Sequence, residues 1–303
     1  MRQRILAIVG AVALVVVAVF VRSMISDDGS GGSSGDDGGK PVVACTPDLQ
    51  GICDALEADG RIAADTPALD LADAAAPPAA LDGWITWDPA PGIADIDAEQ
   101  ASANKPWDAG APLGASTLAV AVRGSQLTGA PSGCTQVAFP WTCLDQEASS
   151  SAAIGVGTGT TAESLARLYP IALSLVPDAD SGFRDIPDQR LQSLVNSPPD
   201  GQDPFPDQLR TLQTKVGALN YLVGTTDAFE GAENLTVLTA TPVAQATIVL
   251  APRRGTKDLV AGSALTSSGV QQALRDAGVV PGTGRLAPDD RAGDLYAVRD
   301  KVG

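Results

Sequence analysis

The sequence predicts an α/β fold of two lobes that follows an N-terminal transmembrane helix. Three observations predict it: a long apolar run at the start of the chain, short apolar segments that alternate with amphipathic ones, and a second series of the same kind after residue 116. Alternating strands and helices are typical of sheets that are covered by helices. Because the series occurs twice, we expect two α/β lobes.

Residues 1–25 have the properties of a signal anchor. Seventeen residues, 5–21, are all apolar or glycine, and Arg2 and Arg4 precede them. A helix of this length nearly crosses a hydrocarbon core of roughly 30 Å, and basic residues before it favour a cytoplasmic N-terminus. Cleavage is the alternative, but a signal peptide has a shorter apolar core and a small-residue cleavage site. We expect a single-pass cell-membrane protein whose C-terminal domain is extracytoplasmic.

A flexible tether follows the anchor. Residues 26–40 read SDDGSGGSSGDDGGK and contain no apolar residue. A coil rich in glycine and serine has an end-to-end distance of about 5–6 Å × √n, which gives these residues a reach of roughly 20 Å. We expect the folded part of the chain to begin near residue 41.

The charge and the residue types exclude several functions. Without Arg2, Arg4 and Arg22, the 20 basic residues become 17 against 36 acidic ones, so residues 27–303 carry a net charge of −19. Such a surface repels nucleic acids. The chain has no histidine, which excludes Ser-His-Asp hydrolases, Cys-His proteases and imidazole metal sites. We therefore expect no enzymatic activity, no cofactor and no metal.

The four cysteines fall into two local pairs, Cys45 with Cys53 and Cys134 with Cys143. An extracytoplasmic location favours disulfides, and of the three possible pairings we favour these two because each closes a short loop. The alternative is a zinc or iron–sulfur site, but the C-x7-C and C-x8-C spacings differ from the usual C-x2-C ligand pairs. Cys45 also follows Val-Val-Ala as in a lipoprotein, although it lies too far beyond the apolar run for lipidation.

The elements of the first half follow one another closely. The helix that opens at Thr46-Pro47-Asp48 has apolar residues at i, i+3, i+4 and i+7 and ends at Gly60. The other predicted elements are strands at 42–45, 61–64 and 83–87 and a helix at 66–75. The order of strands and helices predicts a parallel sheet.

The second half repeats this order. Residues 116–122 alternate in side-chain size as in a strand, and Thr158-Gly159-Thr160-Thr161 forms a loop between a strand and a helix. The remaining predictions are strands at 152–156, 235–239 and 246–250 and helices at 162–175, 191–195, 209–219, 260–265 and 270–277.

Six segments carry a resemblance to a known family: Val43–Leu49, Leu81–Trp87, Ser116–Val122, Trp141–Leu144, Ile154–Ala166 and Thr247–Pro281. Together they resemble the type II periplasmic binding proteins, the extracellular solute-binding components of ABC importers, over residues 41–281. The resemblance implies that residues 41–115 and 241–303 form lobe 1, with the C-terminal tail, and that residues 116–240 form lobe 2. A membrane-anchored domain of this kind is similar to those of actinobacterial envelope proteins.

The resemblance also implies a ligand site in the cleft between the lobes. Loops at the carboxyl ends of strands bind ligands in open α/β sheets, which selects Thr46, Asp48, Thr158, Thr160, Thr161 and Thr226, with Trp87 at the rim of the cleft. Asp48 would oppose an anion and suit a cation or a polyol. The alternative for the threonines is helix capping, and for Trp84 and Trp87 it is core packing.

Two other motifs have simpler explanations. The glycines from Gly155 to Gly159 do not form the G-x-G-x-x-G dinucleotide motif, and Asp95, Asp97 and Glu99 fit a solvated helix face. We therefore expect a tethered domain that binds a small polar ligand, with an ABC permease or another envelope protein as partner. A domain that binds no ligand and serves as an assembly module of an envelope complex is the alternative.

Overall fold

The computed structural model describes residues 40–123, 133–135, 139–149, 152–176, 182–195, 204–256, 265–286 and 289–302. They belong to one compact unit, residues 40–303. The predicted anchor, nearly all of the tether and most of the short helix predicted at 260–265 lie outside the described residues. Within the described ranges, no helix is long and apolar enough to cross a membrane.

The first lobe is built on a mixed sheet. Strand β1 (Val43–Cys45) pairs in parallel with β2 (Gly83–Trp87), and β8 (Gln245–Pro252) runs antiparallel beside β2. The first part of β3 (Ala111–Arg123) pairs with the other edge of β8 and with β9 (Val280–Pro281), again antiparallel. The prediction of a parallel sheet is therefore wrong for the centre of this sheet, where the neighbours of β8 come from distant parts of the chain.

The second lobe uses the other end of β3. From Leu118 onward, β3 pairs antiparallel with β6 (Tyr221–Thr225) and β7 (Leu235–Thr241). Two short parallel pairs extend this sheet: β5 (Ile154–Gly155) with β6, and β4 (Phe139–Pro140) with β7.

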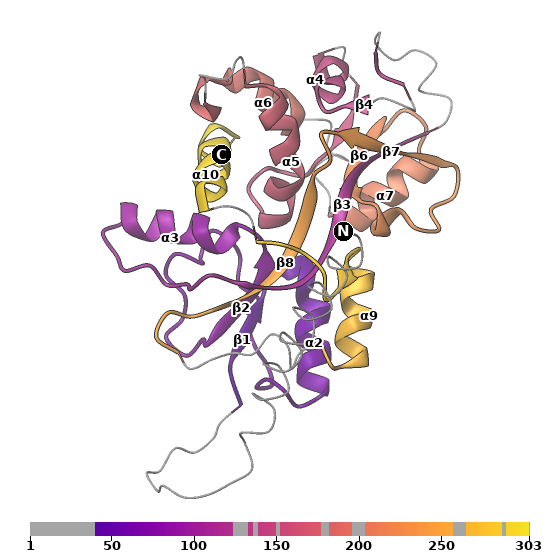
Figure 1. Ribbon diagram of the computed structural model, residues 1–303. Coiled ribbons are helices and arrows are strands. Elements are labelled where there is room, and N and C mark those ends of the chain that lie inside the picture. Colours follow the sequence, from indigo (N-terminus) through magenta and orange to yellow (C-terminus); the bar gives the residue numbers. More distant parts are fainter. Residues whose placement is uncertain are drawn as a thin grey trace, which may run out of the picture. The chain divides into compact units, whose positions relative to one another are not determined.

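Two chain segments connect the lobes. Strand β3 exchanges its partner β8 for β6 and β7 between Thr117 and Leu118, and three residues, 242–244, join β7 to β8. A hydrogen bond of 2.8 Å from the backbone N–H of Leu118 to the carbonyl of Ala244 joins these two crossings. Figure 1 shows β3 and β8 running from the region of α2 and α9 toward β6 and β7. The predicted residue bounds of the lobes stay predictions.

Helices cover both sheets. In the first lobe the 3-10 turn η1 (Pro47–Leu49) leads into α2 (Gln50–Ala58), which packs against α9 (Ser268–Asp276), and α3 (Ala90–Gln100) follows β2. The second lobe contains α4 (Thr142–Ser149), α5 (Ala162–Ser174), η3 (Phe183–Asp185), α6 (Asp188–Val195), α7 (Phe205–Thr214) and η5 (Asp227–Phe229). Helix α10 (Asp289–Val302), which we did not predict, packs against α3, α5 and α6 (Figure 1).

Two elements predicted after the first helix are not present. Residues 61–64 and 66–75 form bends and turns, with one isolated bridge between Ala68 and Cys45. The N–H of Leu69 donates to the carbonyl of Cys45 over 2.9 Å, which holds the backbone extended where the helix would begin. Residues 69–76 therefore continue in i, i+3 turns.

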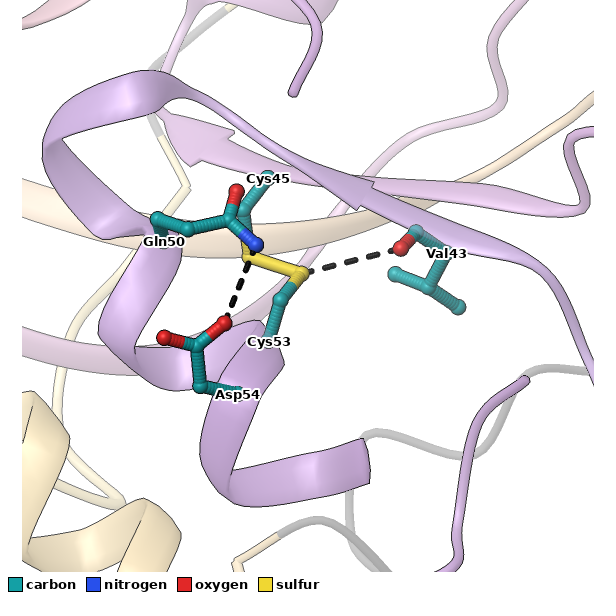
Figure 2. Close-up of a disulfide and its surroundings, with 5 residues drawn as sticks. All are labelled: Val43, Cys45, Gln50, Cys53 and Asp54. Atoms are coloured by element: carbon teal, nitrogen blue, oxygen red, sulfur yellow. Dashed lines mark hydrogen bonds between the residues drawn. A yellow bond between two sulfur atoms is a disulfide. The ribbon is translucent and has the colours of Figure 1, made fainter. Parts of the chain in front are cut away.

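Both predicted disulfides are present in the structure, Cys45–Cys53 and Cys134–Cys143, with Cα–Cα distances of 6.0 and 5.9 Å. Figure 2 shows the first, which joins the end of β1 to α2. Both of its sulfur atoms belong to fully buried residues, and the Sγ of Cys53 lies 3.6 Å from the carbonyl oxygen of Val43. In the same helix, Gln50 donates to Asp54 one turn later. The disulfide therefore fixes the strand end from which Thr46 and Asp48 continue.

The acidic face of α3 is less solvated than we predicted. Both Nη atoms of Arg299 donate to the carboxylate of Asp97, and Asp95 accepts from the backbone N–H of Trp107 over 3.2 Å. Arg254 also contacts Asp95, at 3.5 Å. These acids bind α10 and two loops to α3, which an isolated helix pattern does not reveal.

Candidate ligand-binding site between the lobes

A cavity of about 550 Å³ lies between loops of the two lobes. Its volume is within the range of small-molecule sites, about 300–1,000 Å³. The lining residues are Thr46, Pro47, Asp48, Asp70, Leu71 and Ala72 on the side of β1, and Gly157, Thr158, Thr160, Thr161, Ala162, Glu163, Arg167 and Pro204 on the side of α5. The lining combines hydroxyls and charged groups with small apolar surfaces.

The first wall follows directly from β1. The backbone N–H of Thr46 donates to the carbonyl of Ile85 over 3.0 Å, so this residue continues the pairing of β1 with β2. Asp48 lies in η1, where its Oδ2 accepts the indole N–H of Trp87 over 2.6 Å. Thr46 occupies the position before η1, but its side chain makes no capping hydrogen bond. The capping alternative for Thr46 is therefore not observed.

The second wall is the loop from β5 to α5. Gly157 and Gly159 have φ angles of 93° and 74°, a conformation that other residues rarely adopt. Thr161 caps α5 in a capping box with Ser164, whose N–H donates to the Thr161 Oγ1 over 3.2 Å. Thr160 does not cap the helix, and its hydroxyl lies 2.8 Å from that of Thr158. Thr161 thus lines the cavity and caps the helix, whereas Thr158 and Thr160 have hydroxyls that reach solvent.

Arg167 lines the cavity with a side chain that is almost fully buried. Its guanidinium lies 3.3 Å from Oε1 of Glu163, one helical turn earlier, and donates to Gln208 at 3.4 Å and to the carbonyl of Val223 at 3.3 Å. The ring of Phe205 lies beneath it, with 5.3 Å between the guanidinium carbon and the ring centroid. These contacts hold a buried cation at the junction of α5, α7 and β6.

A smaller cavity of about 30 Å³ lies behind this arginine. Its lining includes Trp87, Glu163, Arg167, Phe205 and Thr225. One water needs at least about 10–15 Å³ of this kind of volume, so the space suits an ordered water. Nε of Arg167 and Oγ1 of Thr225 are buried here with no hydrogen-bond partner among the described residues. A water between them would supply both partners.

Burial shifts the two acids of the site. Asp48 is an exposed residue, but neighbouring groups take water from its carboxyl, and this desolvation raises its pKa, while the hydrogen bonds from Trp87 and from its own backbone N–H and a weaker contact from Thr46 oppose the rise. Desolvation also raises the pKa of Glu163, where the charge of Arg167 opposes the rise and the charge of Asp48 adds to it. The two carboxyls and the arginine thus form one electrostatically coupled group.

Five of the seven predicted ligand residues line the main cavity: Thr46, Asp48, Thr158, Thr160 and Thr161. Trp87 is buried and lines the small cavity instead of the rim of the cleft, and it holds Asp48 in place. Thr226 is in the lining of neither cavity. Its hydroxyl lies 2.9 Å from that of Ser116, which also donates to Asp227, beside the crossing of β3. Trp84, for which we favoured core packing, is fully buried with its ring centroid 5.4 Å from that of Trp107.

Sequence analysis missed three polar contributors, Glu163, Arg167 and Asp70. A signal existed for two of them, because Glu163 and Arg167 are four residues apart at the start of a helix that follows a predicted ligand loop. Asp70 had no such signal, since residues 66–75 were predicted as a helix.

Comparison with known proteins identifies the fold. No family model and no curated protein sequence matches the chain. Among solved structures, the periplasmic binding protein AfuA from Actinobacillus pleuropneumoniae aligns with a TM-score of 0.52, 12% identity, and coverage of 88% of this chain and 95% of its own. The chain has the fold of a type II periplasmic binding protein.

Two other solved structures align over similar lengths. A periplasmic thiamin-binding protein matches with a TM-score of 0.50 and 12% identity, over 90% of this chain and 100% of its own. Thiaminase I from Bacillus thiaminolyticus matches with a TM-score of 0.48 and 16% identity, over 80% and 85%. At these identities the similarity establishes the fold, and the ligand has to be argued from the residues of this chain.

Proposed function

We propose that this protein is a solute-binding protein without enzymatic activity, which binds a small polar ligand in the 550 Å³ cavity between its lobes. The observation that carries the proposal is the group of charged side chains in the lining of that cavity. Two carboxylates and a buried arginine meet there next to hydroxyls, whereas the remaining lining is largely apolar. Ligand pockets commonly combine an apolar surface with a few polar groups that fix the orientation of the ligand.

The direct test is ligand-dependent stability. A ligand that binds only the folded protein adds about 2.7 kcal/mol to the free energy of unfolding at 100 times its dissociation constant. Thermal unfolding of residues 40–303 in the presence of sugars, polyols, amines, amino acids and oxyanions should therefore reveal at least one compound that raises the melting temperature. If no compound does so, the ligand-binding proposal fails and the assembly-module alternative replaces it.

We further propose that residues 1–25 anchor the protein in the cell membrane and that the tether places the binding domain on the extracytoplasmic side. The support is the seventeen-residue apolar run after Arg2 and Arg4. A binding domain held there could deliver its ligand to an ABC permease or to another envelope protein. Protease added to intact cells should remove the domain, and complete protection would contradict this topology.

A further inference from the structure

The main cavity carries more acidic than basic groups. Among its described lining residues, Asp48, Asp70 and Glu163 are acidic and Arg167 is basic. One guanidinium can balance the charge of only one carboxylate, and its closest carboxylate is Glu163, at 3.3 Å. An occupant that brings a positive charge would therefore be favoured over one that brings a negative charge.

The hydrogen bonds inside the site leave acceptors open toward the cavity. The indole of Trp87 occupies Oδ2 of Asp48, and Arg167 occupies Oε1 of Glu163. The other oxygen of Glu163 accepts no hydrogen bond from a described residue, although this side chain is only partly exposed. The second oxygen of Glu163 is thus an open acceptor, which a ligand that donates hydrogen bonds would satisfy.

Thr46 adds an independent observation. Its side chain is only 3% exposed and lines the cavity. Oγ1 makes no hydrogen bond of ordinary length and angle with a described residue, although it lies close enough to the carboxylate of Asp48 to oppose the rise in the pKa of that group. A buried hydroxyl without a partner destabilises a fold, so such a group at a cavity wall indicates a missing ligand or water. The unpartnered donor of the site, Nε of Arg167, belongs to a side chain that lines both cavities, and the small cavity has room for a water.

We propose that the ligand is a small organic cation with one ammonium group, which lies between Asp48 and Glu163 within reach of the Thr46 hydroxyl. The ammonium donates to the open carboxylate oxygens and to Thr46 and supplies the positive charge that the cavity lacks. The rest of the ligand contacts apolar surface of Pro47, Leu71 and Pro204. This inference rests on the proposed binding function and names the chemical class of its ligand.

Matched pairs of probes test the charge directly. 3-Amino-1,2-propanediol is compared with glycerol, and 4-amino-1-butanol with 1,4-butanediol, by isothermal titration of residues 40–303, so that each pair differs only in an ammonium group that replaces a hydroxyl. We expect the cation of at least one pair to bind ten-fold or more tightly than its neutral partner. Equal binding within both pairs, or tighter binding of the neutral compounds, would overturn the assignment of a cationic ligand.

Substitutions then locate the ammonium. We expect Asp48→Asn and Glu163→Gln each to weaken binding of the better cation by ten-fold or more while the neutral partner is unaffected. The controls are Asp54→Asn on α2 and Glu233→Gln before β7, two exposed acids that do not line the cavity. The control variants change the net charge by the same amount as the site variants. If the controls lose as much affinity as the site variants, the effect is one of overall charge, and the proposed location of the ammonium group is overturned.

The two possible failures give different results. If sugars or oxyanions stabilise the protein and no cation does, the protein binds a ligand but the inferred ligand class is wrong. If no compound of any class stabilises it, the binding function itself fails. Circular dichroism of each variant establishes that it folds. A further variant is Thr46→Val, which keeps the volume of the side chain but removes the hydroxyl. We expect this variant also to weaken cation binding.

Discussion

The indole N–H of Trp87 donates to Oδ2 of Asp48 over 2.6 Å, so strand β2 fixes a carboxylate that belongs to the loop after β1. Hydrogen bonds to charged groups contribute about 1.5–3 kcal/mol. We expect Trp87→Phe to lower the free energy of unfolding by about 1.5 kcal/mol and also to weaken ligand binding, because the carboxylate loses its orientation. Urea unfolding and titration with the best ligand measure the two effects.

Trp141→Phe is the matched control for this variant. Trp141 is also fully buried, and its indole N–H donates over 2.8 Å to the carbonyl of Pro242, but it does not line either cavity. We expect it to lower stability without changing affinity. If both variants weaken binding equally, the hydrogen bond to Asp48 has no specific role in the site.

The raised pKa values of Asp48 and Glu163 predict how stability depends on pH. Burial raises both above their ordinary values of 3.8 and 4.5, so the folded protein binds protons more readily than the unfolded chain does. The free energy of unfolding should therefore fall as the pH rises from the ordinary values to the raised ones. In Asp48→Asn, part of this fall should disappear. Unfolding of the ligand-free protein at a series of pH values tests the sign, and a rise over that interval would contradict it.

The same two groups couple ligand binding to protons. A cation near Asp48 and Glu163 favours their ionised forms, so affinity for a cation should increase as the pH rises through the raised pKa values of these two groups. Calorimetry in two buffers with different ionisation enthalpies should detect proton release on binding. A neutral polyol should release none.

The two disulfides differ in their relation to the site. Cys45 directly precedes Thr46 and is joined to α2 by Cys53, whereas Cys143 lies in α4, and neither it nor Cys134 lines the main cavity. The closed loops are of similar length, so replacing either pair with alanine should cost about 2–3 kcal/mol of stability. We expect only the replacement of Cys45 and Cys53 to weaken ligand binding, as measured on folded protein. Equal effects of both pairs would show that the first disulfide does not position the ligand loop.

The sequence allowed accurate prediction where local patterns decide the structure. Strand 83–87 and the helix after Thr161 form nearly as predicted, because an apolar run and a capping residue specify them without distant partners. Thr46, Asp48 and Thr158 were found because each lies between a strand and the helix that follows it. These residues meet in one cavity because β1 and β5 both direct their loops toward it.

The parts that were missed depend on contacts between distant residues. The antiparallel partners of β3 lie more than 90 residues away, and nothing local specifies them. The predicted helix at 66–75 is prevented by the pairing of Ala68 with Cys45. Arg167 was overlooked because its role follows from Gln208 and Phe205, which reach it from another helix.

The threonines of the second wall separate capping from ligand contact. Thr161 accepts from Ser164 as the N-cap of α5, so Thr161→Ala should lower the free energy of unfolding by about 1 kcal/mol. Among the described residues, the Thr158 hydroxyl has hydrogen bonds with the hydroxyl and the backbone N–H of Thr160. Thr158→Ala should therefore change stability by no more than about 0.5 kcal/mol. We expect Thr158→Ala to weaken ligand binding. Affinity and unfolding measured on the same variants decide this, and an unchanged affinity would assign Thr158 to the loop alone.

Helix α10 is held to both lobes by charged residues near its C-terminus. The two Nη atoms of Arg299 donate to the two carboxylate oxygens of Asp97 on α3, over 2.6 and 2.5 Å. Nζ of Lys301 donates to Asp188 on α6 at 2.7 Å and to the carbonyl of Ile186 at 2.9 Å. Both basic side chains are less than one-fifth exposed. Because one helix contacts both lobes, it restrains their relative movement, which is how two-lobed proteins open and close.

We therefore expect Arg299→Met and Lys301→Met each to lower the free energy of unfolding by about 1 kcal/mol. Each should also increase the radius of gyration of the ligand-free protein in X-ray scattering, because the lobes can then separate further. Arg210→Met is the control, since Arg210 pairs with Asp207 inside α7 and connects no two lobes. If ligand binding needs a closed cleft, the two α10 variants should weaken ligand binding to a similar extent, because each removes the contact of α10 with one lobe. Added ligand should then return the radius of gyration of each variant to that of the parent protein. Variants that lose stability with no change in either the radius or the affinity would show that α10 only packs against the two lobes and does not restrain their separation.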